Sequence, residues 1–132
     1  MNCLRVYTAT IFSLLWCSSV FGGDIRLFDG SGPMELHVRL TAKTGQAADL
    51  EKAFRGVFYP AISKQKGFRH SNLLSLPDRD GEYVLTISFE SENMRVRWVN
   101  TQLHDSAWSE FAGRYAIESK MTMEVFGAIA VK

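Results

Sequence analysis

The chain has 132 residues, of which 46% are hydrophobic and 22% charged, and this balance is typical of one ordinary globular domain. Its formal net charge is +1 and no basic stripe is present, which argues against a nucleic-acid partner. With two cysteines in all, the sequence excludes a disulfide-rich scaffold and a cysteine-rich metal site.

Residues 1–22 have the layout of a secretory signal peptide. Arg5 supplies a positive charge, residues 6–21 are apolar or small, and Gly22 precedes the expected cleavage. Cleavage would remove both cysteines and one basic residue. We therefore expect an exported protein, periplasmic or secreted, that has no contact with the membrane after cleavage. The alternative is that translation starts at Met34, which would make the protein cytoplasmic.

A linker or N-terminal arm is expected over residues 23–33, because Gly, Asp, Ser and Pro dominate there. The folded domain is expected over residues 34–132. Its first strand is predicted where Leu36, Val38 and Leu40 alternate with polar residues, which places one face of the strand in the core.

An amphipathic helix follows, since apolar residues recur every three or four positions from Ala47 to Ile62. Pro60 lacks an amide proton and crowds the carbonyl of Gly56, so we expect a kink or a restart there. Gly67 is a candidate left-handed residue that ends this helix.

Two strands are predicted next, over residues 68–76 and 83–89. The turn formers of residues 77–81 join them in a hairpin. Ser91 is a plausible N-cap for the helix that follows the second of these strands.

That helical stretch should break at Asn100-Thr101 and then resume. A fourth strand is predicted from Met121 to about Val131, where apolar and polar residues alternate. The order strand, helix, strand, strand, helix, strand predicts an α+β fold of the ferredoxin-like β-α-β-β-α-β type. Such a fold has a four-stranded antiparallel sheet with both helices on one face.

The other sheet face would carry His37, Val84, Phe126 and, depending on register, Phe68. An uncovered face with this much apolar area predicts burial by association. We therefore expect a homodimer that packs sheet to sheet.

Three residues of the second helical region are the main candidates for a site: Trp98, His104 and Trp108. His104 and Trp108 are one helical turn apart on one face, and aromatic rings of this kind can line a pocket for a flat organic molecule. His104 is the candidate catalytic base, because a neutral imidazole can accept a proton from a substrate. Trp98 and Trp108 would form pocket walls. The alternative is that these rings are ordinary core.

Phe89, at the end of the third strand, is a candidate wall of the same pocket. His70 and Asn72 could reach that pocket and orient a substrate if both face the helices, although Leu73 and Leu74 leave the parity of their strand ambiguous. No His, Asp or Glu set has the spacing of metal ligands, and no nucleotide motif is present, so we expect no cofactor.

The charged residues of this helical region predict no further site. Glu92 and Arg95, three residues apart on the helix, are expected to form a surface ion pair.

The chain resembles the antibiotic biosynthesis monooxygenase domain family, a branch of the dimeric α+β barrel proteins. The resemblance covers about residues 34–131. It is carried by the first strand with Thr44-Gly45-Gln46, by Lys66-Gly67-Phe68-Arg69, by the Leu85–Glu92 segment and by the Trp98, His104, Trp108 helix. It implies a dimeric α+β barrel and a cofactor-independent monooxygenase or related oxidoreductase that acts on a small aromatic or quinol-type molecule.

A haem-degrading branch of that family is similar in the spacing of its second helix, and its tryptophan matches Trp98. Its first-strand asparagine falls on Val38, and its haem-ligating histidine falls on Trp108. Valine offers no hydrogen-bond donor and indole cannot ligate iron. These two positions depart from the haem-degrading pattern, while the helix spacing and Trp98 keep a haem-binding or haem-degrading protein of the cell envelope as one alternative. A non-enzymatic small-molecule-binding or structural dimer module is another.

Overall fold

The computed structural model describes residues 30–128. The predicted signal peptide of residues 1–22, most of the predicted arm, and the predicted end of the fourth strand lie outside the described residues. Within residues 30–128, no helix combines the length and the apolar character needed to cross a bilayer.

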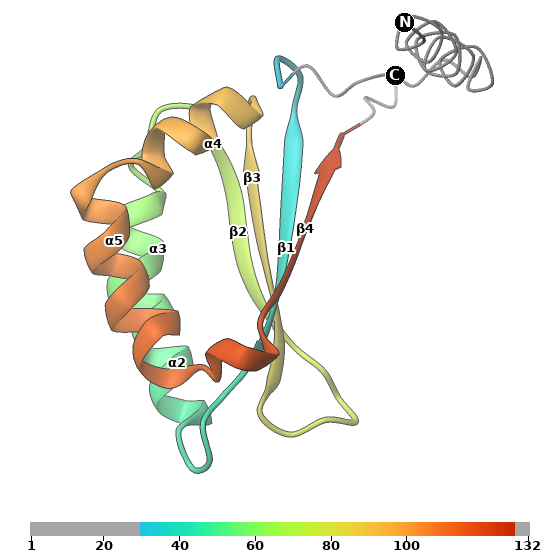
Figure 1. Cartoon of the computed structure of the whole chain (residues 1–132), viewed down its shortest axis with the longest axis vertical. Helices are drawn as coiled ribbons and strands as arrows, with labels where there is room; N and C mark the ends of the chain where they lie inside the picture. The colour runs from blue at the N-terminus through green and yellow to red at the C-terminus, as the bar shows by residue number, and fades with distance from the viewer. Residues whose placement is uncertain (1–29, 129–132) are drawn as a thin grey trace, which may run out of the picture.

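Four antiparallel strands form one sheet in the order β2-β3-β1-β4. These are β1 (Met34–Thr41), β2 (Phe68–Ser75), β3 (Glu82–Phe89) and β4 (Thr122–Gly127). Figure 1 shows the sheet edge-on with the helices on one side only. The predicted ferredoxin-like fold class is confirmed, and the sheet stays open within one chain because β2 and β4 are edges.

The first helical region is continuous but changes its winding. It comprises α2 (Ala47–Ala53), a π-helical segment η1 (Phe54–Phe58) and α3 (Tyr59–Ile62). Pro60 lies in the first turn of α3, where its missing amide proton costs least. The interruption predicted at Pro60 is therefore present. The helix widens into a π-helical turn before Pro60, and the α-helix starts again at Tyr59.

The second helical region breaks where the sequence predicts. It comprises α4 (Glu92–Val99), α5 (Gln102–Trp108) and the π-helical η2 (Ser109–Gly113). The Ser91 hydroxyl accepts a hydrogen bond from the amide of Met94 at 3.2 Å and caps α4. The Thr101 hydroxyl does the same for α5, as described below. A short 3₁₀ turn, η3 (Glu118–Lys120), leads from this region into β4.

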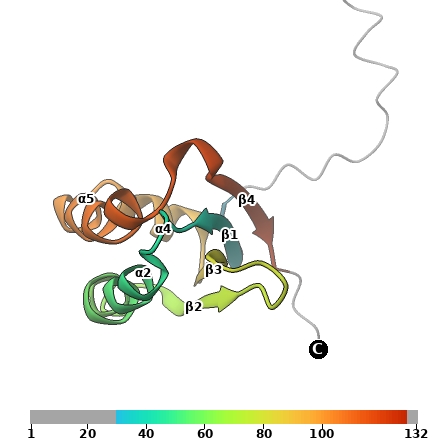
Figure 2. The same cartoon turned by 90° about the horizontal axis from the view of Figure 1, so that it is seen from below.

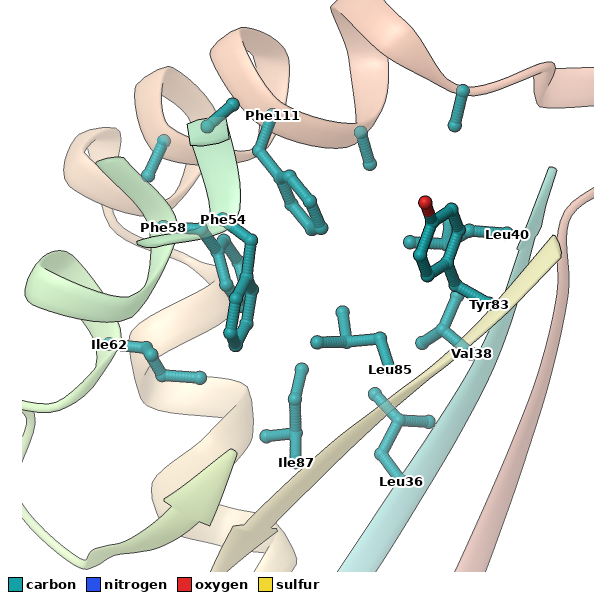
Figure 3. Close-up of a cluster of buried hydrophobic side chains, with 14 of the residues drawn as sticks. Leu36, Val38, Leu40, Phe54, Phe58, Ile62, Tyr83, Leu85, Ile87 and Phe111 are labelled. Atoms are coloured by element: carbon teal, nitrogen blue, oxygen red, sulfur yellow. The ribbon is translucent and has the colours of Figure 1, made fainter. Parts of the chain in front are cut away.

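Side chains of β1 and β3 that face the helices meet aromatic rings from the two helical regions (Figure 3). Leu36 of β1 pairs with Ile87 of β3, and both are buried. Phe58 and Phe111 approach from opposite helical regions with ring centroids 5.0 Å apart. The two π-helical segments therefore meet over the centre of the sheet and hold its helices in place.

β4 is exposed on both sides, unlike the two central strands. Every residue from Thr122 to Gly127 is exposed, and Met123, which faces the helical side beside Val38, is 57% exposed. Figure 2 shows β4 at the side of the sheet away from α2. The helical layer therefore leaves an opening along β4.

The uncovered face of the sheet carries His37, Val84 and Phe126, as predicted. Phe68 is not part of it: Phe68 pairs with the buried Phe89 and lies on the helical face. A register shift between Phe68 and His70 turns the rest of β2, so that His70 lies opposite Ser88 on the uncovered face.

One buried hydroxyl ties β3 to α2. Tyr83 is buried, and its hydroxyl donates a hydrogen bond to Oε1 of Glu51 at 2.7 Å. Burial raises the pKa of Tyr83 to about 12, with further contributions from the hydrogen bond to Glu51 and from its charge. Because this pKa lies above the ordinary value of 10.0, the neutral phenol stabilises the fold fully below pH 10. That contribution is lost as the pH rises through about 12.

We expect Tyr83→Phe to remove this alkaline pH dependence. Between pH 10 and pH 12, the free energy of unfolding of the unmodified chain should fall by about 2 kcal/mol relative to that of Tyr83→Phe. Urea denaturation across this range measures the difference. Tyr59→Phe, at a 41% exposed tyrosine, is the control for removal of a phenol hydroxyl. A stability curve for Tyr83→Phe parallel to that of the unmodified chain would contradict the assignment.

Candidate functional site

A cavity of about 140 Å³ lies between the second helical region and the sheet. Strands β1 and β3 form its floor, η1 and the second helical region form its walls, and β4 borders it where the sheet is exposed. The lining residues are Leu36, Val38, Phe58, Ile87, Arg95, Trp98, Val99, His104, Trp108 and Met123. The cavity is therefore apolar, with a few polar groups among aromatic rings.

His104 lies between two indole rings at the wall of this cavity. Its ring stacks on Trp108 at 6.1 Å with an interplanar angle of 11°, and it meets Trp98 edge-on at 4.7 Å. The His104 amide donates to the Thr101 hydroxyl at 3.2 Å, so the cap of α5 fixes the start of this arrangement. The structure thus brings together the three residues that the sequence singles out.

The imidazole of His104 lies beside the carboxylate of Asp105. Its Nδ1 lies 3.2 Å from Oδ1 of Asp105, and its side chain is 16% exposed. In the tautomer with the proton on Nδ1, that nitrogen donates to Asp105 and Nε2 is free to accept a proton. The geometry therefore suits a proton acceptor at the edge of an apolar cavity.

Trp98 is the most enclosed of the three and carries a polar group without a partner. The residue is 3% exposed, and its ring packs against Phe58 at 5.6 Å and Phe89 at 6.1 Å. Among the described residues, nothing accepts a hydrogen bond from its buried Nε1. Buried indole N–H groups usually have an acceptor, so an unpaired one beside a cavity indicates a place for a ligand oxygen or water.

The sequence predicts that Glu92 and Arg95 form an ion pair at the surface, and this placement is wrong. The two side chains are 17% and 19% exposed, and Arg95 lines the cavity. Nε of Arg95 donates to Oε2 of Glu92 at 2.7 Å, and Nη2 donates to Oε1 at 2.5 Å. The sequence does hold a signal for this placement, because Arg95 is three residues before Trp98 and shares its helix face.

The remaining predicted residues lie elsewhere. Phe89 is on the helical face but fully buried behind Trp98, so it supports the wall without lining the cavity. His70 and Asn72 would reach the cavity only if they faced the helices. Both are on the uncovered face of the sheet instead. His70 Nε2 lies 3.8 Å from Glu35, and Asn72 borders a separate hollow at the β2 edge.

The size of the cavity limits its ligand. An apolar protein cavity of about 150 Å³ holds one benzene ring, and this one has about 140 Å³. A tetrapyrrole is larger than this space, and the imidazole that borders the cavity is packed between two indoles. Within residues 30–128, no group of three or more His, Cys, Asp or Glu side chains could hold a metal ion.

Solved structures share this fold at low sequence identity. SnoaB of Streptomyces nogalater, described as a cofactor-independent oxygenase, is 18% identical with a TM-score of 0.66. The match covers 76% of this chain and 96% of SnoaB. A Caulobacter crescentus protein proposed to be an antibiotic biosynthesis monooxygenase is 16% identical with a TM-score of 0.66, over 76% of this chain and 93% of its own. At these identities the likeness establishes a common fold.

Sequence comparison identifies the family directly. Among curated proteins, no sequence relative was found. The profile of the family described as antibiotic biosynthesis monooxygenase matches residues 33–108. This range runs from the start of β1 to the end of α5 and so includes His104 and both indoles of the cavity. Since the match spans more than half of the sequence, the chain belongs to the antibiotic biosynthesis monooxygenase family.

Proposed function

We propose that this protein is a cofactor-independent monooxygenase that oxidises a small, single-ring aromatic molecule of the quinol type. The observation that carries the proposal is the benzene-sized cavity in which His104 lies between Trp98 and Trp108. Membership of the family and the fold shared with SnoaB support the same reaction class.

In the proposed reaction, His104 is the general base. It removes a phenolic proton from the quinol, which makes the ring electron-rich enough to give one electron to O₂. The resulting radical pair joins through a new carbon–oxygen bond. The peroxide O–O bond then breaks, the ring carbon loses its proton, and water leaves.

The reaction balances without an external reductant. One hydroquinone and one O₂ give one hydroxybenzoquinone and one water, so the substrate supplies every electron that O₂ accepts. His104 returns its proton to the departing water. The apolar walls hold the flat ring against the indoles.

Oxygen uptake with hydroquinone tests this proposal. With heavy-isotope oxygen gas, one labelled atom should appear in the hydroxylated quinone and one in water, at a rate above that of the buffer alone. Because the substrate itself could autoxidise, the rate with heat-unfolded protein is the matched blank. Uptake equal to the blank for hydroquinone and its methyl-substituted forms would overturn the proposal.

We also propose that the protein works as a homodimer formed through the uncovered sheet face. Phe126 and Leu74 are exposed there, and Val84 of β3 lies beside Leu74. Packing this face against a second copy would remove exposed apolar area from water. Sedimentation equilibrium at micromolar concentration should give twice the chain mass, and a single-chain mass would contradict the proposal.

A further inference from the structure

We propose that the cavity selects an aromatic oxyanion and that Arg95 is the residue that recognises it. This inference rests on the proposed function, because it names the chemical class of the molecule that the same cavity takes. It assigns a binding role to Arg95, which has no part in the proton transfer described above.

The inference rests first on the position of the Arg95 guanidinium. Arg95 lies on α4 one turn before Trp98, its side chain is largely buried, and it lines the cavity with His104. Both hydrogen bonds to Glu92 come from Nε and Nη2. Within residues 30–128, Nη1 donates to no other side chain or carbonyl. Glu92 thus fixes the plane of the guanidinium and leaves two N–H groups of Nη1 for a ligand.

The inference rests secondly on the other side chains that line the cavity. Trp98 also lines the cavity, and its buried Nε1 has no acceptor among the described residues. The other side chains that line the cavity are aliphatic or aromatic, apart from Met123 and the imidazole of His104. Among the residues that the structure describes, no carboxylate, amide or hydroxyl side chain lines it. A cavity with unpaired donors and few acceptors is complementary to a ligand that brings oxygen acceptors.

Electrostatics favour an anion over a neutral acceptor. A charge-assisted hydrogen bond is about twice as strong as a neutral one, and low-dielectric walls strengthen it further. Glu92 compensates part of the positive charge of Arg95, so the pair stays stable when the cavity holds no anion. For a quinol substrate, Arg95 would then stabilise the phenolate that forms when His104 takes the proton.

Binding of benzoate and benzamide tests the inference without any turnover. The two molecules have nearly the same shape, and only benzoate is charged at neutral pH. Trp98 and Trp108 are next to the cavity, so tryptophan fluorescence reports binding. The unmodified chain should bind benzoate about tenfold more tightly than benzamide, and Arg95→Gln should lose that preference while keeping its benzamide affinity.

Glu92→Gln is the second variant, and it tests anion recognition by Arg95 even if Arg95→Gln does not fold. Because it removes the competing carboxylate, it should tighten benzoate binding and leave benzamide binding unchanged. Equal affinity for both probes, binding of neither, or an unchanged preference in a folded Arg95→Gln protein would overturn the inference. So would benzoate affinity that does not rise in Glu92→Gln.

The two proposals fail separately. Arg95-dependent benzoate preference without oxygen uptake would leave the anion site standing and remove the oxygenase. Oxygen uptake with hydroquinone but no benzoate preference would leave the oxygenase and remove the anion site.

Discussion

Replacing His104 by glutamine should lower quinol-dependent oxygen uptake by a factor of about 10² to 10⁴ while the protein stays folded. This is the range by which a positioned general base accelerates proton transfer. Glutamine keeps a flat polar group between Trp98 and Trp108, so the cavity walls should remain in place. The loss should therefore appear in kcat, with KM changed only a few-fold.

His70→Gln is the matched control for that substitution. His70 is also a partly exposed histidine, but it lies on the opposite face of the sheet beside Glu35. Its replacement should leave the rate of oxygen uptake unchanged. If a folded His104→Gln protein kept half of the original rate, His104 would not be the base and the mechanism would have to be abandoned.

Local patterns predict the fold well because each is a short-range physical rule. Alternation of apolar residues in β1 places Leu36 and Val38 on the helical face, where both are buried. The Ser91 hydroxyl caps α4 as expected. The break at residues 100–101 is likewise found between α4 and α5.

The sequence leaves the facing of His70 and Asn72 open, and the structure gives the reason. Strict alternation from the helix-facing Phe68 would put His70 and Asn72 on the helical face as well. The register shift between Phe68 and His70 inserts one residue and reverses the parity, so Ser71 and Leu73 face the helices instead. Nothing in the residue types marks this shift, because Arg69 and its neighbours suit either face.

Arg95 and the π-helical segments depend on tertiary packing. The sequence spacing puts Arg95 on the face of Trp98, but only the docking of α4 against the sheet makes that face a cavity wall. The π-helical η1 adds one residue to a turn, a change too small to alter the spacing of apolar residues that predicts the helix.

Phe58 is the residue whose truncation should cost the most stability. It is fully buried, and its ring lies within 6 Å of the rings of Trp98, Trp108 and Phe111. Removing a buried phenylalanine side chain costs about 3–5 kcal/mol, through lost transfer free energy and the space left behind. Since small domains unfold with about 5–15 kcal/mol, Phe58→Ala should shift urea denaturation markedly.

The same substitution links stability to the site, because Phe58 lines the cavity. Truncation should enlarge the space so that a two-ring aromatic such as naphthalene binds and restores part of the lost stability by mass action. Tyr59→Ala, at the neighbouring and 41% exposed position, is the control and should lose less stability and gain no naphthalene response. A loss below about 1 kcal/mol for Phe58→Ala would mean that the helices do not pack over the sheet through this ring.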